Sequence, residues 1–114
     1  MKQLNRFKYA MMGIRWLVFK DNHFIIHFLL GVVAVAVSAI LGIERIEWVF
    51  IVSAIFMVLI AEAFNTSIEA AVDLTTSTYH PLAKAAKDAG AAAVLLSSLY
   101  AVIVALIIFL PYLF

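Results

Sequence analysis

Residues 48–61 read WVFIVSAIFMVLIA, a run without a charged side chain, and residues 62–74 continue it as EAFNTSIEAAVDL, with three carboxylates. A long apolar run of this kind is typical of a helix that crosses a bilayer. At a rise of roughly 1.5 Å per residue, a helix over 47–73 is longer than the hydrocarbon core. We therefore expect its polar C-terminal half to reach or pass one membrane interface.

The composition of the whole chain indicates the same environment. Of the 114 residues, 67% are hydrophobic and 13% are charged, whereas soluble domains are nearer half apolar and a quarter charged. The mean hydropathy is +1.11. A single domain over 1–114 has too little interior to bury so much apolar surface, so we expect lipid to be the solvent for most of it.

Several classes of chemistry are excluded by residue usage. The chain has no cysteine, which removes disulfides, thiolate nucleophiles and cysteine-based zinc sites. Its four glycines fit neither a Walker loop nor a dinucleotide fingerprint. A signal peptide is not expected, because the first apolar run starts late, is long, and is not followed by a small-residue cleavage pattern.

Three further helices are expected around the central one. Residues 1–22 mix five Lys or Arg with apolar side chains, which favours an amphipathic helix on an anionic membrane surface or an ordinary juxtamembrane anchor. Residues 24–41 form a first span that Gly42 ends. After a Ser/Thr-rich loop, Pro81 occupies the first turn of a helix that spans about 83–111. The expected fold is all-α integral membrane: one surface helix and three transmembrane helices.

The basic residues of the connections predict the orientation in the membrane. The N-terminal segment holds five Lys or Arg and the second connection holds Lys84 and Lys87, whereas the first turn holds only Arg45. Basic residues in short loops favour the cytoplasmic side. We therefore expect the N-terminus and residues 74–88 in the cytoplasm and the C-terminus outside.

The polar side chains of the central span form one stripe. At about 100° per residue, Glu62, Asn65, Thr66, Glu69 and Asp73 fall within an arc of about 100°. An acidic residue near the bilayer centre costs about 2.5–3.5 kcal/mol. Several on one face are tolerated only if they face protein, water or a metal ion.

A structural polar zipper, in which Asn65 and Thr66 hydrogen-bond between helices, is one interpretation of this stripe. It accounts poorly for two glutamates about two turns apart, because carboxylates at one site repel unless a cation lies between them. Lys87 is one source of that charge. Magnesium, which prefers oxygen ligands and bridges carboxylates and phosphates, is another. The stripe therefore favours a catalytic or ion-binding role.

Two blocks of the chain resemble the signature of the prokaryotic diacylglycerol kinase family. They are EAFNTSIEAAVD at 62–73 and YHPLAKAAKDAGAAAVLL at 79–96. The similarity extends over essentially the whole chain. HPLAKAAKDA and the terminal IIFLP at 107–111 are more similar to the Gram-positive branch, whose enzymes mainly phosphorylate undecaprenol.

The resemblance implies an enzyme that transfers the γ-phosphoryl group of Mg-ATP to a lipid primary alcohol. Undecaprenol is the favoured acceptor, and diacylglycerol is the alternative. The resemblance also implies a multi-pass protein of the bacterial cell membrane, with a cytoplasmic N-terminus. It further implies a homotrimer whose active sites are shared between neighbouring subunits. Nucleic acid is not expected as a partner.

The resemblance also implies roles for individual residues. Glu62 matches the general base that takes the proton of the lipid hydroxyl, and Glu69 matches a magnesium ligand. Asp21, in KDNHFIIH, stands where the family usually has a second metal-binding glutamate. The residues implied to contact or frame ATP are Asn65, Asp73, His80, Lys87 and Asp88, with Arg6 or Arg15 as an N-terminal arginine.

Two other classes of function remain open at this point. One is a small ion-coupled transporter, in which a membrane glutamate relays protons or binds a cation, and the other is a purely structural membrane subunit. Neither requires magnesium-dependent use of ATP. His23 and His27 are expected to snorkel or to hydrogen-bond, because nothing in the sequence supplies a matching set of metal ligands.

Overall fold

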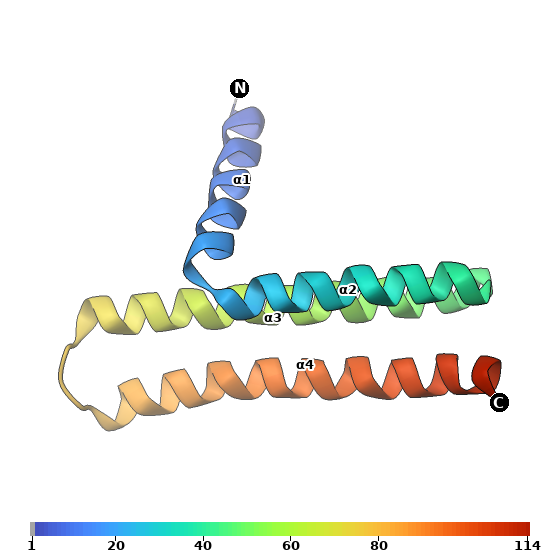
Figure 1. Ribbon diagram of the computed structural model, residues 1–114. Coiled ribbons are helices and arrows are strands. Elements are labelled where there is room, and N and C mark those ends of the chain that lie inside the picture. Colours follow the sequence, from blue (N-terminus) through green and yellow to red (C-terminus); the bar gives the residue numbers. More distant parts are fainter. Residues whose placement is uncertain (1) are drawn as a thin grey trace.

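Within residues 2–114, which the computed structural model describes, the chain forms four helices. They are α1 (Lys2–Lys20), α2 (Asn22–Leu41), α3 (Arg45–Thr75) and α4 (Pro81–Leu113). Helix α3 packs against both α2 and α4, and α1 projects away from this bundle near the start of α2 (Figure 1). The expected all-helical fold class is thereby confirmed.

Three of these helices, α2, α3 and α4, are long and apolar enough to cross a membrane, judged by length and composition. In the most apolar stretch of α3, 28% of the residues are buried, against 17% in α2 and 11% in α4. Helix α3 is therefore the central element. Large apolar side chains such as Ile40 and Ile107 remain on the outside, as expected for surface that faces lipid.

Helices α3 and α4 each extend two residues further at both ends than the spans expected over 47–73 and 83–111. Local capping explains their starts. At the start of α3, Glu47 Oε1 accepts a hydrogen bond of 2.9 Å from the Glu44 N–H, which is part of a capping box. Pro81 lies in the first turn of α4, where His80 Nδ1 accepts from the Leu82 N–H at 3.1 Å.

Asp21 separates α1 from α2, although the surface helix was expected to run to residue 22. Its backbone is extended, with φ −120° and ψ 104°, and its Oδ1 accepts a hydrogen bond of 2.9 Å from the His23 N–H. This is the geometry of an N-cap, which ends one helix direction and begins another. The chain therefore turns at Asp21, and α1 leaves the bundle there (Figure 1). A position of α1 on the membrane surface stays a prediction.

The packing between helices depends on small residues. The main cluster of buried apolar side chains joins α3 and α4 with Ile43 and is centred on Ile51, Ala54, Val104 and Ile108. A Cβ added at Gly31 of α2 would lie 2.8 Å from Ile55 Cγ2 of α3. Small side chains let helix backbones approach closely where lipid supplies no hydrophobic driving force between helices. At the far end of α2, Gly42 adopts φ 65° and ends the helix, as expected.

Candidate functional site: two polar cavities along α3

The first of two polar cavities lies between the start of α2, the middle of α3 and α4. Its volume is about 450 Å³. It is lined by Asp21, His23, His27, Glu62, Asn65, Thr66, Glu69, Ala91 and Val94. The stripe residues from Glu62 to Glu69 therefore line an open cavity, and small or apolar α4 side chains form its opposite wall.

Glu62 is buried in the wall of this cavity, with 5% of its surface exposed. His27 Nε2 lies 3.6 Å from Glu62 Oε2. One carboxylate oxygen of Glu62 also lies within 4.8 Å of ligand-type atoms of Asp21 and His23. Two carboxylates this close are stable only with a proton or a cation near them. The arrangement therefore favours a proton or a cation between these carboxylates.

Asp21 is held in position by residues of two helices. The Thr66 hydroxyl of α3 donates a hydrogen bond of 2.8 Å to Asp21 Oδ2, and the His23 N–H binds the other oxygen. Burial acts to raise the pKa of Asp21, but the hydrogen bond from Thr66 and that from the His23 backbone help to outweigh it and lower the pKa below its usual value. Asp21 is therefore an anion at neutral pH.

Asn65 links the stripe to α4. Its Nδ2 donates a hydrogen bond of 3.2 Å to Glu69 Oε1. Its Oδ1 is buried and has no hydrogen-bond partner among residues 2–114. A Cβ at Gly90 of α4 would lie only 2.5 Å from this oxygen, so the amide fits because position 90 has no side chain. The buried oxygen therefore lies against α4, and the amide nitrogen holds Glu69.

The oxygen atoms of this first cavity fit a magnesium ion. Asp21 and Glu69, which both line it, supply carboxylates. Carboxylate and amide oxygens are ligands that hard dications prefer. Magnesium in proteins is usually held by one or two carboxylates together with substrate phosphates. The expected metal ligands thus line one cavity.

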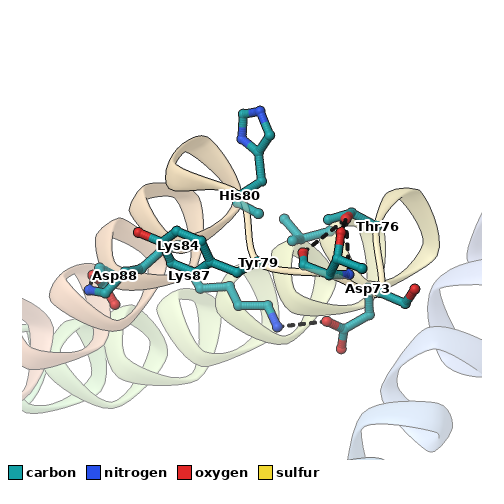
Figure 2. Close-up of a pocket in the computed structure, with 11 residues that line it drawn as sticks. Asp73, Thr76, Tyr79, His80, Lys84, Lys87 and Asp88 are labelled. Carbon is teal, nitrogen blue, oxygen red and sulfur yellow. Dashed lines mark hydrogen bonds and ion pairs between the residues drawn. The ribbon is translucent and has the colours of Figure 1, made fainter.

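The second cavity, of about 500 Å³, lies where α3 ends and α4 begins (Figure 2). Lys87 Nζ lies 2.6 Å from Asp73 Oδ1, and Lys84 Nζ lies 2.6 Å from Asp88 Oδ2. All four side chains are at least 43% exposed. Exposed ion pairs of this kind are weak and exchange readily for another anion. Lys87 thus lies beside Asp73. The sequence had suggested Lys87 as one source of positive charge between Glu62 and Glu69, but it does not lie between them.

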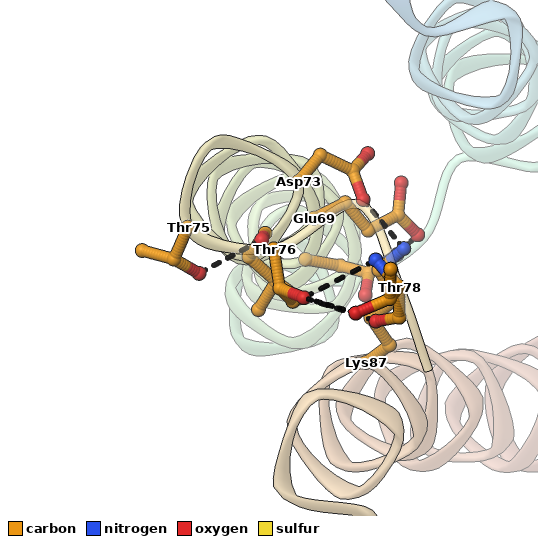
Figure 3. Close-up of polar contacts among 8 residues, drawn as sticks. Glu69, Asp73, Thr75, Thr76, Thr78 and Lys87 are labelled. Carbon is orange, nitrogen blue, oxygen red and sulfur yellow. Dashed lines mark hydrogen bonds and ion pairs between the residues drawn. The ribbon is translucent and has the colours of Figure 1, made fainter. Parts of the chain in front are cut away.

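The connection between α3 and α4 is held by its own threonines. The Thr76 hydroxyl donates to Thr78 O at 3.0 Å and accepts from the Thr78 N–H at 3.2 Å. His80 uses Nδ1 to cap α4, and its ring points away from the Asp73–Lys87 pair (Figure 2). Glu69 and Asp73 project from the same side of α3, near Lys87 (Figure 3). Glu69 lines the first cavity and Asp73 lines the second, so these two neighbouring side chains link the cavities.

The two arginines of α1 lie apart from these cavities. Neither Arg6 nor Arg15 lines the first or the second cavity in the part of the chain that the structure describes. The Arg15 guanidinium instead lies over the Phe19 ring, 5.9 Å from its centroid. An ATP contact by either arginine stays a prediction. It requires another subunit or another position of α1.

Three residues of the first cavity were not expected as parts of a site. Thr66 was grouped with the stripe, but its contact with Asp21, which joins α3 to the α1–α2 corner, was not anticipated. His27 and His23 were expected to snorkel or to hydrogen-bond. Their spacing of four residues places both on one face of a helix, and this was the available signal. Their partner Glu62 is far away in the sequence.

The fold and the two cavities define a class of protein: a multi-pass helical membrane protein with a polar site of carboxylates, lysines and imidazoles along one helix. The chain belongs to the prokaryotic diacylglycerol kinase family, whose model matches residues 8–109. The family takes its name from lipid kinases, and kinases use ATP.

Individual relatives carry two different names. The chain is 39% identical over 106 residues to a diacylglycerol kinase from Synechocystis sp., covering 92% of this chain and 61% of the relative. It is 37% identical over 113 residues to an undecaprenol kinase from Bacillus subtilis, covering 96% of this chain and 92% of the relative. A diacylglycerol kinase from Escherichia coli is 43% identical over 70 residues, which are 61% of this chain and 57% of that protein. The chain thus spans less than two thirds of two of these relatives, and identity alone does not separate the two substrate classes.

Proposed function

We propose that this chain transfers the γ-phosphoryl group of Mg-ATP to the primary hydroxyl of undecaprenol. The observation that carries the proposal is the position of Glu62, a buried carboxylate at the inner end of the polar stripe. It lines the first polar cavity, and its neighbour His27 lines both this cavity and an apolar groove. The undecaprenol kinase of Bacillus subtilis, which aligns over nearly the full length of both chains, supports this choice of acceptor.

An apolar groove supports the position proposed for the lipid. A cavity of about 350 Å³ runs along α2, α3 and α4 and is lined mainly by small and aliphatic side chains, among them Gly31, Ala34 and Ala54. His27 lines both this groove and the first polar cavity. A chain lying in the groove would therefore bring its terminal hydroxyl to Glu62. Apolar grooves discriminate weakly between hydrocarbon chains, so the fit of the groove favours lipid in general.

The position proposed for the nucleotide is the other end of the stripe. Lys84 and Lys87 line the second cavity, where they would exchange their carboxylate partners for phosphate oxygens. Asp73, His80 and Asp88 would frame the nucleotide there. Glu69 and Asp21 would hold the magnesium ion, which supplies charge neutralisation on the phosphates. Asn65 would keep Glu69 oriented.

The chemical step then needs few groups. Glu62 accepts the proton of the lipid hydroxyl as that oxygen forms a bond to the γ-phosphorus, and the bond from this phosphorus to the ADP oxygen breaks. The products are the lipid phosphate and ADP. Phosphoryl transfer depends mainly on positioning and on charge stabilisation. The role of Glu62 in this scheme is that of a general base.

We also propose a homotrimer with shared sites and a cytoplasmic N-terminus. The basic residues of α1 and of the second connection support this orientation. Arg6 and Arg15 lie away from the cavities of their own chain, which supports a role toward a neighbouring subunit.

The test is phosphate transfer from radiolabelled Mg-ATP by the detergent-purified protein, with undecaprenol and diacylglycerol offered separately. We expect the faster transfer to undecaprenol. The names of the relatives from Synechocystis and Escherichia coli favour diacylglycerol as the second candidate, and a preference for it would replace the acceptor and keep the mechanism. Transfer to neither lipid would contradict the proposed function.

The variant Glu62→Gln tests the base directly. We expect transfer to fall about 10²–10⁴-fold, because glutamine cannot take the hydroxyl proton. The control is Glu44→Gln, which changes an exposed glutamate at the other end of α3. Circular dichroism and gel filtration would show that both variants are folded. Wild-type transfer by Glu62→Gln would remove Glu62 from the mechanism.

A further inference from the structure

His23 is left without a role by the kinase scheme, although it lies at the same cavity. One potential ligand atom from each of Asp21, His23 and Glu62 lies within 4.8 Å of the other two. His23 is exposed, Asp21 is half-buried and Glu62 is buried, so the group leads from the surface into the bundle. Glu69, the expected magnesium ligand, is not part of this group.

We propose that Asp21, His23 and Glu62 form a binding site for a transition-metal dication of the zinc class. This site shares Asp21 with the proposed magnesium site and differs from it in His23 and Glu62. Two carboxylates and one neutral imidazole are a ligand set that zinc accepts. Magnesium prefers a shell of oxygen ligands only. The imidazole of His23 therefore gives this site a preference that the oxygens around Glu69 do not have.

The charge balance of the group supports a dication. The Asp21 and Glu62 carboxylates together carry two negative charges when ionised, and they lie side by side in a partly buried place. Among residues 2–114, the basic group paired with Glu62 is the His27 imidazole, at 3.6 Å. A dication between the carboxylates would remove their repulsion.

The groups that would orient the metal ligands are already in place. Asp21 is fixed by the Thr66 hydroxyl at 2.8 Å and by the His23 N–H at 2.9 Å. His27, one turn after His23 on α2, flanks Glu62. Hydrogen bonds of this kind orient ligands and raise metal affinity. Ligand bonds of about 2.0–2.2 Å require the three atoms to close by roughly 1 Å, and rotation of the exposed His23 side chain supplies this movement.

The consequence for the enzyme is inhibition. A metal ion bound here withholds Glu62 from the lipid hydroxyl and Asp21 from the magnesium ion. This consequence rests on the proposed function, whereas the binding itself does not. Micromolar zinc should therefore inhibit transfer in the presence of excess magnesium, and a chelator selective for zinc should restore transfer.

The experiment is a titration of the chelator-treated, detergent-purified protein with Co²⁺, followed by the visible absorption of the bound ion. ATP and lipid are left out, so the result does not depend on kinase activity. We expect one Co²⁺ per chain, displaced by Zn²⁺ and not by millimolar Mg²⁺. His23→Gln should weaken binding at least about 100-fold. Thr66→Val should weaken it about 10–100-fold, because the hydrogen bond that orients Asp21 is lost.

Two matched controls separate this site from its neighbours. His80→Gln removes a histidine of the second cavity, at the start of α4, and Glu69→Gln removes the carboxylate expected for magnesium. Both should bind Co²⁺ like the wild type. The absence of a cobalt band, unchanged binding by His23→Gln, or equal loss in Glu69→Gln would each overturn the proposal. Cobalt binding without phosphate transfer would uphold this site and reject the proposed function.

Discussion

Single residues of the first cavity illustrate how a polar group is kept in a membrane protein. Glu62 and Thr66 are each 5% exposed, and both face the corner at Asp21 where α1 meets α2. Thr66 satisfies its hydroxyl there, whereas Glu62 has neighbours but no fixed cation. Thr66 therefore stabilises the structure, whereas Glu62 is the residue proposed for the chemistry.

Thr66 is expected to stabilise the corner. Thr66→Val keeps the shape of the side chain and removes its hydrogen bond to the ionised Asp21, so the free energy of unfolding should fall by about 1–2 kcal/mol. Titration with sodium dodecyl sulfate in mixed micelles measures this change. Thr66→Ser retains the hydroxyl and should lose less. An unchanged unfolding curve for the valine variant would show that this contact adds nothing to stability.

Gly90 is expected to position Asn65. In Gly90→Ala, the new Cβ would lie 2.5 Å from Asn65 Oδ1, so the amide must move and its hydrogen bond to Glu69 weakens. We expect the magnesium concentration needed for half-maximal transfer to rise, with helix content unchanged. Gly13→Ala is the matched control because a Cβ there meets nothing within 4 Å. Equal magnesium dependence in both variants would contradict the positioning role.

At the scale of elements, α3 combines two functions along one helix. Its N-terminal part packs in the core through Ile51 and Ala54, and its C-terminal part carries the stripe. The helix has 31 residues, about 46 Å at 1.5 Å per residue, whereas the hydrocarbon core is about 30 Å thick. The stripe can therefore bring a lipid hydroxyl within the bilayer close to a nucleotide outside it.

The turn between α2 and α3 sets how these helices pack. Gly42 adopts φ 65°, a left-handed conformation that costs a residue with a Cβ about 1–2 kcal/mol. We expect Gly42→Ala to lower the free energy of unfolding by that amount, measured by the same micelle titration. Gly42→Asn should lose less, because asparagine tolerates this conformation. Equal stability of the alanine variant would mean that the turn relaxes without strain.

At the scale of the molecule, the cavities lie open on a thin bundle with extents of 52 × 40 × 20 Å. Most of the large apolar side chains outside the small core are exposed. Part of this surface meets lipid, and part is free to meet other subunits. The proposed trimer would place α1 arginines of one chain near the nucleotide of another.

Shared sites are tested by mixing two inactive variants. Glu62→Gln and the double variant Arg6→Met/Arg15→Met each lack one part of the reaction. If a site takes Glu62 and the α1 arginines from different chains, some mixed trimers contain an intact site. We expect transfer to return to a measurable fraction of the wild-type rate when the two variants are unfolded, mixed and refolded together. Separate refolding followed by mixing is the control. No recovery would contradict a site shared between Glu62 of one chain and the α1 arginines of another.

The sequence by itself determined the local properties of this protein. The apolar runs predicted three long helices, and Gly42 and Pro81 predicted helix ends. The helical periodicity of about 100° per residue predicted one polar stripe. These predictions were possible because hydropathy and capping act over a few residues. Only the tertiary structure decided that Asp21 meets Thr66, that His27 flanks Glu62, and that Gly90 makes room for Asn65. These contacts join residues far apart in the chain, and they depend on how closely and at which register the helices pack. A periodic pattern cannot specify that register.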